Sequence, residues 1–359
     1  MTAMREQISR SARDRATADF FELSKRIKAS ALLDRRYGWY IARAVILAVG
    51  LVIITSLLFG LGRTPWQLLN AVAFALLLTQ VAFFGHDAAH HQVLASGRRN
   101  EWLSRIVANL VVGLSHGWWT RKHGRHHAHP NTIGKDDDIA TGALVFDPDD
   151  VPRRTGLVGW ITRHQGWLFF PMLTLEGLNL HISGIRTIIR DPQMEYRRTE
   201  AALIAVRLAG FPLLVLFVLG PALGAGFLGI QLMVFGIYMG ACFAPNHKGM
   251  PLLPGRAGVN FLQRQVLTSR NIRGGRVMSW AMGGLNYQIE HHLFPRMPSV
   301  NLRRAQPIVR DFCAERGIPY TETGLLDAYG TVIRYLNRVG LGHSDPFECP
   351  LVTAYRPTR

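Results

Sequence analysis

Four long apolar runs dominate the sequence and set its fold class. They cover residues 39–61, 66–84, 202–219 and 227–244. Each has close to the ~20 residues that a helix needs to cross roughly 30 Å of hydrocarbon. Most of the 41 Lys and Arg and 24 Asp and Glu residues lie between these runs, which is the pattern of an integral membrane protein. We therefore predict an all-α membrane protein with four transmembrane helices.

Short links join the runs in pairs, which predicts two helical hairpins. Residues 62–65 connect the first pair and residues 220–226 connect the second. The links carry one basic residue, Arg63, whereas Lys and Arg are abundant in the segments on the other side. Because positive charge is retained in the cytoplasm, we expect both termini and a helical cap on the cytoplasmic side. Arg207 interrupts the third run, and Pro212 is expected to kink it.

The chain is predicted to divide into three parts. These are an N-terminal amphipathic segment (residues 1–38), the main domain (39–320) and a cytoplasmic C-terminal tail (321–359). The N-terminal segment carries an apolar stripe that would lie on the membrane surface or on the protein body, made by Phe20, Phe21, Leu23 and Ile27. In the main domain, amphipathic pieces suited to the membrane interface cover 102–114 and 157–190, and a helix covers 301–316.

The charge balance and the cysteines exclude several other classes. A net charge of +17 follows from the cytoplasmic Lys and Arg, and no basic patch interleaved with aromatic residues indicates nucleic acid. The three cysteines, Cys242, Cys313 and Cys349, show no paired spacing, which argues against a disulfide framework or a thiolate metal site. Residues 1–30 lack the apolar core of a secretory signal peptide, so we expect the N-terminus to be retained.

Histidines are concentrated between residues 118 and 131, in the stretch WWTRKHGRHHAHPN. His123, His126 and His127 stand at i, i+3 and i+4, so a helix places their imidazoles on one face. Imidazole nitrogen suits iron, copper, nickel and zinc. A basic, solvated helix containing Lys122 and Arg125 is the alternative interpretation. The other histidine groups decide between the two.

Four groups of histidines that are distant in the sequence all fall on the predicted cytoplasmic side. The candidate metal ligands are His86, His90, His123, His126, His127, His247, His291 and His292. Because one zinc site takes about four ligands, eight imidazoles predict two metal ions. So many nitrogen donors without a spaced Glu-x-x-His pair favour a di-iron centre that activates oxygen, ahead of copper or zinc.

Three of these groups resemble known motifs. HDAAH (86–90), HGRHH (123–127) and QIEHH (288–292) are similar to the three histidine boxes of the integral-membrane fatty acid desaturases, and GGLNYQIEHHLFP resembles their acyl-lipid and front-end branch. The resemblance covers residues 66–320. It implies two Fe ions, O2 as co-substrate, and a double bond introduced into a long fatty acyl chain carried by a lipid or by coenzyme A. The implied ligands are the histidines of the boxes, and His247 matches a further histidine that the family uses after the fourth span.

The third box departs from the common family pattern. Gln288 stands where many relatives have histidine, and glutamine is at best a weak or water-mediated ligand. In the first box, His90 at i+4 fits better than His91, and His129 lies outside the boxes. Neighbouring polar residues are expected to orient the ligands or to hold a water near the metals, namely Asn246, Asp87, Glu290 and the run Asp136–Asp138.

The resemblance also bears on partners. The sequence has no haem-binding HPGG motif of a fused cytochrome b5 domain, so we expect an external electron donor, such as a ferredoxin or a cytochrome b5-type protein with its reductase. The bilayer and the acyl substrate are the other expected partners. A histidine-box hydroxylase or acetylenase would use the same metals. A membrane metal transporter is an alternative of another class, but transport sites lie near the midplane, whereas these histidines lie beyond the helix ends.

Several aromatic and basic residues have two interpretations. The aromatic group would wall an acyl tunnel or anchor the membrane interface, and consists of Trp118, Trp119, Trp280 and Tyr287. The basic group would bind a phosphate head group, coenzyme A or an acidic donor, or would only supply cytoplasmic charge; it consists of Lys122, Arg125, Arg270, Arg273 and Arg276. His164, His181 and His343 are isolated and are expected to be structural or exposed.

Overall fold

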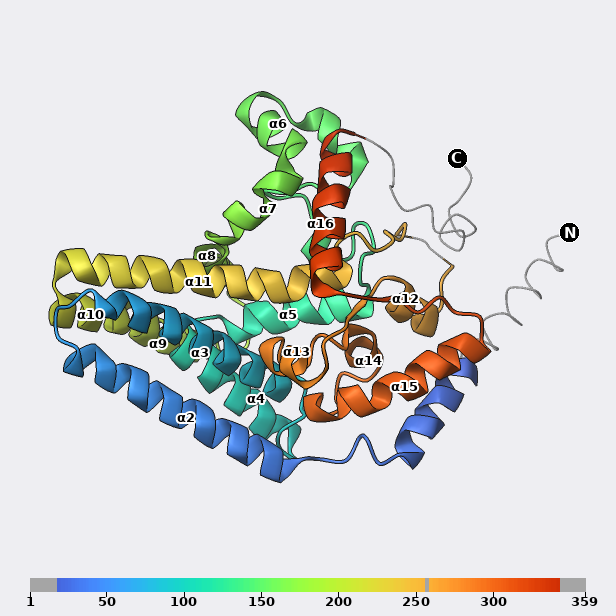
Figure 1. Ribbon diagram of the computed structural model, residues 1–359, viewed down its shortest axis with the longest axis horizontal. Coiled ribbons are helices and arrows are strands. Elements are labelled where there is room, and N and C mark those ends of the chain that lie inside the picture. The colour runs from blue at the N-terminus through green and yellow to red at the C-terminus, as the bar shows by residue number, and fades with distance from the viewer. Residues whose placement is uncertain (1–17, 256–257, 343–359) are drawn as a thin grey trace, which may run out of the picture. The chain divides into compact units, whose positions relative to one another are not determined.

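A computed structural model describes residues 18–255 and 258–342 of the protein (Figure 1). These residues form two compact units. The span unit comprises residues 35–123 and 169–242, and the terminal unit comprises the described residues of 1–34, 124–168 and 243–359. The predictions for His343, Cys349 and the first 17 residues of the N-terminal segment lie outside the described residues.

Within the described residues, four apolar helices are long enough to cross a membrane, as predicted. They are α2 (Tyr37–Gly60), α3 (Trp66–Ala89), the continuous segment Arg197–Leu219 and α11 (Pro221–His247), with mean hydropathies of 2.5, 1.9, 2.5 and 1.8 over their apolar windows. The third consists of α9 (Arg197–Ala205), η4 (Val206–Gly210) and α10 (Phe211–Leu219). The helices extend beyond the predicted runs. Their backbone hydrogen bonds continue through polar residues such as His86 after the apolar sequence stops.

α2 and α3 lie side by side but differ in burial (Figure 1). Only 11% of the apolar window of α2 is buried, against 61% for α3. α2 presents exposed apolar side chains such as Ile41, Ile46 and Val52, and an apolar face of this extent indicates contact with lipid. At the connection between the helices, Gln67 Nε2 donates to the carbonyl of Leu58 (2.9 Å). α3 is therefore the inner helix of the pair.

Two π-helical segments pack against each other in the span unit. η1 (Ile106–Val112) continues α4 (Gly97–Arg105), and η4 lies within the third apolar helix. Pro212 lies two residues after η4. It has no N–H to donate to the preceding turn, and the wider π-helical turn before it accommodates the missing hydrogen bond. The irregularity predicted at Pro212 therefore takes the form of a change of helix type.

A buried carboxylate fixes the start of α5 (His116–Ala128). Glu200 of α9 is fully buried and accepts hydrogen bonds from Ser115 Oγ (2.8 Å), Gly117 N (3.0 Å) and Arg105 Nε (3.3 Å). The Arg105 cation balances the charge of Glu200, as a buried carboxylate requires. This network orients the helix that carries the second histidine box.

The amphipathic pattern predicted over 157–190 is present in α6 (Gly156–Arg163), α7 (Gln165–Leu173) and α8 (Glu176–Arg190). On α8, His181 is buried and donates from Nδ1 to the carbonyl of Gly113 (2.9 Å), while Leu178 and Ile189 are exposed. Burial lowers the pKa of His181 to about 4, so His181 is a neutral structural residue, as predicted. The position of these helices at the membrane interface stays a prediction.

The terminal unit is built around an apolar core. Helical residues 18–29 pack through Leu23 and Ile27 against α12 (Phe261–Leu267), α14 (Gln288–Leu293) and α15 (Ser299–Glu315). The predicted apolar stripe therefore lies on the body of this unit, although Phe21 points outward and is 60% exposed. Arg26 forms an ion pair with Glu315 (2.8 Å) that joins this N-terminal helix to α15. α15 confirms the helix predicted over 301–316.

The rest of the terminal unit contains short helices and a two-stranded sheet. β1 (Asn271–Ile272) pairs in parallel with β2 (Glu322–Thr323). The other elements are η2 (Asp137–Ile139), η3 (Pro148–Arg153), α13 (Gly275–Ala281) and α16 (Leu325–Gly340). Gln165 Nε2 donates to the carbonyl of Leu336 (2.9 Å), and Tyr335 OH donates to that of Phe146 (2.9 Å). The predicted tail thus contains a packed helix, α16.

Candidate metal centre

Three predicted ligands meet in the span unit. His86 lies in the last turn of α3, His90 caps the C-terminus of that helix, and His123 lies on α5. His90 Nε2 and His123 Nε2 are 2.9 Å apart, and the His86 ring centroid lies 4.6 Å from that of His90 and 5.1 Å from that of His123. Trp119, predicted either to wall an acyl tunnel or to anchor the membrane interface, stacks on His123 with ring centroids 4.3 Å apart. We call His86, His90 and His123 the span-unit triad.

A buried carboxylate lies beside the span-unit triad. Asp87 Oδ1 is 3.5 Å from His86 Nδ1. Its other oxygen, Oδ2, accepts hydrogen bonds from Arg43 (2.9 Å) and Tyr40 (3.3 Å) of α2. This 3.5 Å contact is an ion-pair distance and not a hydrogen bond, so the orienting role predicted for Asp87 stays a prediction. Arg43, the charged residue near the start of the first apolar run, forms an ion pair with this carboxylate.

Three further predicted ligands, His126, His247 and His292, meet in the terminal unit. All three are buried, and one ligating nitrogen from each lies within 4.8 Å of the others. His126 Nε2 and His247 Nε2 are 3.3 Å apart. We call these residues the terminal-unit triad. Each Nδ1 faces a hydrogen-bond acceptor: Asp136 Oδ2 for His126 (3.0 Å), Thr268 O for His247 (3.0 Å) and Gln265 Oε1 for His292 (2.9 Å).

These acceptors decide which nitrogen of each imidazole is available to a metal. A neutral imidazole that donates from Nδ1 has a lone pair on Nε2, and metal-binding histidines are commonly oriented in this way. Within the described residues, His292 Nε2 is buried without a hydrogen-bond partner. Lone pairs directed at one another repel unless a proton or a metal cation lies between them. The terminal-unit triad therefore fits a metal ion.

The charges around the terminal-unit triad also favour a cation. Burial, together with the neighbouring histidines, holds the pKa of His292 well below its usual 6.5, so this imidazole is neutral and able to ligate. Burial opposes protonation of His126 as well, but the carboxylates of Asp138 and Asp136 outweigh burial and raise the pKa of His126. Asp138 lies 3.4 Å from His126 Nδ1. The two carboxylates that favour a proton on His126 also favour a bound metal cation.

His127 and His291 complete a group of five histidines in the terminal unit. Their ring centroids are 4.8 Å apart, and the His127 ring stacks on His292 at 4.2 Å. Gln265 holds two members of the group, because its Nε2 donates to the His127 carbonyl (2.9 Å) while its Oε1 accepts from His292. Each of the eight predicted ligands thus lies in one of two histidine clusters, one within each unit. Their role as metal ligands stays a prediction.

Gln288 lies beside the terminal-unit triad. Its Nε2 is 2.9 Å from His247 Nε2, and its Oε1 accepts a hydrogen bond from Asn246 (3.2 Å). Because His247 donates from Nδ1, its Nε2 is an acceptor, and the Gln288 amide donates to it. This position is compatible with the weak or water-mediated role predicted for Gln288, and with Asn246 as a supporting residue.

Two other residues with predicted roles, Glu290 and Arg270, have different partners. Glu290 is fully buried, and its oxygens accept from Asn271 and Tyr320 (both 2.7 Å). Burial raises the pKa of Glu290 to about 7. Arg270, considered as an anion-binding residue, is only 3% exposed and donates to two backbone carbonyls near the end of α11 (2.7 and 2.8 Å). Arg270 therefore supports the fold around His247 and is not a surface charge.

His91 and His129, the two alternative ligands, lie outside both clusters. His91 has a φ of +59°, and its Nε2 is 3.5 Å from Glu101 Oε1. The guanidinium of Arg264 lies 3.0 Å from His129 Nδ1. The geometry therefore favours His90 over His91 and places His129 next to a cation, where a second positive charge is disfavoured.

Two supports of the terminal-unit triad carry no local sequence signal. Gln265 belongs to α12, well before the third box, and only the fold brings its amide to His292. Thr268 acts through its backbone carbonyl, a group that every residue type possesses. By contrast, Asp136 comes from the acidic run that was expected to orient ligand imidazoles, and its Oδ2 lies at His126 Nδ1.

Four apolar helices of membrane-spanning length and two histidine clusters define a class: the protein is a helical integral membrane protein with a histidine-rich candidate metal centre. The profile of the fatty acid desaturase family matches residues 63–324. The chain therefore belongs to the fatty acid desaturase family and is an enzyme of the oxidoreductase class. The match spans nearly the same residues, 66–320, over which the sequence resembles the histidine-box desaturases.

Named relatives agree with this assignment. The chain is 30% identical over 339 residues to the Delta(5) fatty acid desaturase fat-4 of Caenorhabditis elegans, covering 87% of this chain and 70% of the relative. It is 26% identical over 343 residues to the Delta(6)-fatty-acid desaturase fat-3 of the same organism, covering 89% and 74%. It is 28% identical over 292 residues to the acyl-lipid (9-3)-desaturase of Borago officinalis, covering 78% and 65%.

Proposed function

We propose that the protein is an oxygen-dependent di-iron desaturase that introduces a C=C double bond into a long fatty acyl chain. Membership of the family supports the reaction, and the two histidine clusters offer nitrogen ligands that iron accepts. The observation that carries the metal assignment is the terminal-unit triad, in which each of the three Nδ1 atoms has an acceptor, so that Nε2 is the atom each imidazole would offer to a metal. Bound iron would supply, with O2, the oxidation of an unactivated methylene group.

The chain's own residues would hold and orient the ligands. Asp136 keeps a proton on Nδ1 of His126, so that Nε2 can ligate, and the Asp87 carboxylate lies 3.5 Å from His86 Nδ1, where its charge would favour a bound cation. Burial of the terminal-unit triad excludes bulk water and strengthens its interaction with a cation. The residues proposed to hold the two ions are His86, His90 and His123 in the span unit, and His126, His127, His247, His291 and His292 in the terminal unit.

We further propose that the reaction takes place at the cytoplasmic face of the membrane, on an acyl lipid or an acyl-CoA. The single basic residue in the two links between paired spans, Arg63, supports a cytoplasmic location of both termini and of the histidines. The acyl-lipid (9-3)-desaturase of Borago officinalis among the relatives supports an acyl-lipid substrate. An external ferredoxin or cytochrome b5-type protein with its reductase would deliver the electrons.

Expression in a host that lacks the product tests the reaction. Mass spectrometry of the acyl chains with location of the double bond should reveal a new unsaturated species. His126→Ala should abolish this species while the protein still inserts into the membrane, whereas His164→Ala, at an exposed position, should leave it unchanged. A new hydroxyl or triple bond without a new double bond would instead assign the protein to the hydroxylases or acetylenases.

Metal analysis of the purified protein tests the cofactor. We expect about two irons per chain, because eight imidazoles exceed the ligand number of one ion. Oxygen consumption should depend on the presence of iron, of an electron donor and of the acyl substrate. A single zinc ion without oxygen consumption would contradict the di-iron proposal and would favour a non-enzymatic metal-handling membrane protein.

A further inference from the structure

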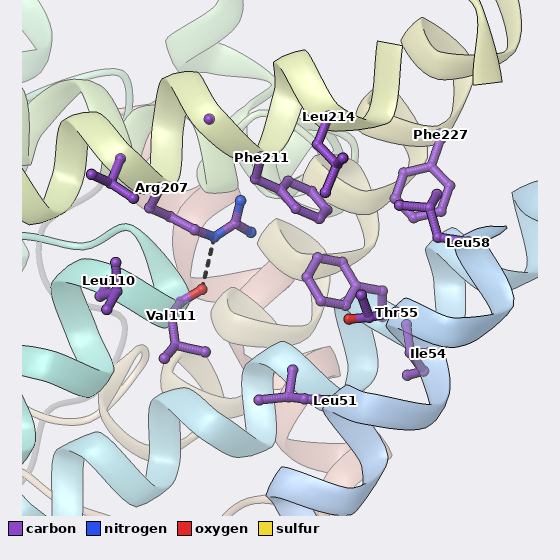
Figure 2. A pocket seen from close by; sticks show the side chains of 13 residues that line it. Leu51, Ile54, Thr55, Leu58, Leu110, Val111, Arg207, Phe211, Leu214 and Phe227 are labelled. Atoms are coloured by element: carbon purple, nitrogen blue, oxygen red, sulfur yellow. Dashed lines mark hydrogen bonds between the residues drawn. The ribbon is translucent and has the colours of Figure 1, made fainter. Parts of the chain in front are cut away.

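The span unit contains a recess between its apolar helices (Figure 2). Its volume is about 410 Å³, within the ~300–1,000 Å³ of small-molecule pockets. The lining is almost entirely apolar and includes Leu51 and Leu58 of α2, Phe74 of α3 and Phe227 of α11. On α3, His86 lies more than three helical turns beyond Phe74, about 18 Å along the axis. The recess is therefore a site of its own.

The recess is accessible from the lipid-facing surface of the span unit. Val206 and Leu214, which line it, are 60% and 38% exposed. Both belong to the third apolar helix, whose exposed apolar side chains indicate contact with lipid. Phe74 and Phe227, which also line it, are buried. A molecule dissolved in the bilayer can therefore reach the recess without crossing water.

One cation lines this apolar recess. Arg207 is 8% exposed, its Nε donates to the carbonyl of Val111 (2.7 Å), and its guanidinium carbon lies 4.1 Å from the ring centroid of Phe211. Figure 2 shows the guanidinium extending from its helix toward the side chains that line the recess. Among the described residues, the two terminal nitrogens of Arg207 donate no hydrogen bond and no carboxylate pairs with them.

The position of Arg207 in the helix calls for an anionic partner. It lies five residues beyond Ala202, where the apolar run begins, which places it about 7.5 Å along the helix from that end. An ionisable residue at this depth is costly and by default marks a functional site with a partner. A carboxylate matches the guanidinium in charge and in its forked geometry. The apolar walls beyond it match a hydrocarbon chain.

Both elements that hold the guanidinium are π-helical. Arg207 lies in η4, and Val111, whose carbonyl accepts from it, lies in η1. π-helical turns are rare and occur frequently at functional sites. Their local distortion brings a cation from one segment and a carbonyl from the other to the wall of the same recess. The π-helical segments and the charge of Arg207 therefore both indicate a functional site at this recess.

We propose that this recess binds a free long-chain fatty acid, with its carboxylate on Arg207 and its hydrocarbon chain against Leu51, Leu58, Phe74 and Phe227. The occupant is defined by a single small anionic head and one apolar chain. It is distinct from the acyl chain that the histidine clusters are proposed to desaturate. The site would make the span unit responsive to the free fatty acid content of the membrane.

Fluorescence titration of the purified full-length protein in detergent tests this proposal. The probe is cis-parinaric acid, and its methyl ester is the neutral counterpart with the same chain. We expect the acid to bind at least about tenfold more tightly than the ester, because only the acid offers a carboxylate to Arg207. Arg207→Gln should reduce the affinity for the acid to that for the ester. Arg198→Gln, which removes one exposed charge from the same helix, is the matched control and should bind as the wild type does.

A second variant fills the recess and leaves Arg207 in place. Gly210 lines the recess, has a helical φ of −63°, and a Cβ added there meets no atom within 4 Å. Gly210→Leu should therefore fold normally and weaken binding of the acid by about tenfold or more. Equal affinities for acid and ester, or unchanged binding by Gly210→Leu, would overturn the proposal. So would native mass spectrometry that finds a phospholipid in place of a fatty acid, lost on Gly210→Leu.

Discussion

At the scale of single residues, the hydrogen bond at Nδ1 decides what each histidine can do. In the terminal-unit triad, a carboxylate, a backbone carbonyl and a carboxamide each take one Nδ1 proton. These three acceptors differ chemically but have the same effect, since each directs the Nε2 lone pair toward the neighbouring imidazoles. The predicted ligand set of this triad therefore consists of pairs of residues, each pair made of a histidine and its acceptor.

The acceptor of His292 provides a direct test of this idea. Gln265→Leu removes the acceptor at nearly constant volume, so His292 loses its fixed orientation, and we expect iron affinity to fall by ~10–100-fold. Gln265→Glu keeps an acceptor at this position and should recover part of the affinity. Competition with a chelator measures the affinity, and Gln263→Leu on the same helix is the control. Unchanged iron affinity in Gln265→Leu would show that Nδ1 of His292 needs no acceptor.

The residues that the sequence could predict are those with a local pattern. His86 and His90 at i, i+4, and the HGRHH box on α5, follow from helix geometry alone, and the structure brings them to two clusters. Glu290, within the third box, is predicted to orient a ligand, but its oxygens accept hydrogen bonds from Asn271 and Tyr320. Sequence adjacency says nothing about which group a carboxylate meets after folding. Gln265 and Thr268 could not be predicted, because neither carries a local sequence signal for its contact with a histidine.

At the scale of elements, α5 is the helix whose placement matters most, because it contributes to both histidine clusters. Its start is fixed within the span unit by Glu200, which accepts from Ser115 and Gly117. The four apolar helices were predictable because hydrocarbon thickness sets a minimum run of apolar residues. The π-helical segments and α16 were not, since helix type and the packing of an amphipathic helix depend on tertiary contacts.

Removal of the Glu200 carboxylate should destabilise the start of α5 and leave the buried Arg105 without its ion-pair partner. Glu200→Ala leaves Arg105 buried without its counter-charge, and breaking a buried pair in this way costs about 3–5 kcal/mol. We expect a large drop in the unfolding midpoint in detergent, together with loss of activity. Glu195→Ala, at an exposed position just before the same helix, should change the midpoint little. Equal midpoints for the two variants would mean that Arg105 finds another partner.

At the scale of the whole molecule, each unit carries one histidine cluster and its own support. The span unit holds three of the eight predicted ligands and the terminal unit holds five, so the bound metal would be linked to the folding of both. A metal that binds only the folded state stabilises it by an amount that grows with the logarithm of its concentration. Stability measured with and without iron therefore reports on the clusters even when no substrate is turned over.

Chelation should lower the thermal midpoint of the purified protein, and added Fe²⁺ should restore it. At a free metal concentration of ~100 times Kd the expected stabilisation is about 2.7 kcal/mol for one site. His292→Ala removes a buried imidazole whose Nε2 is a predicted ligand and should reduce the metal-dependent shift, whereas His164→Ala, outside both clusters, should retain it in full. An equal midpoint with and without iron in the unsubstituted protein would contradict the metal site. Packing alone would then hold the imidazoles together, and protons shared between them would account for their common orientation.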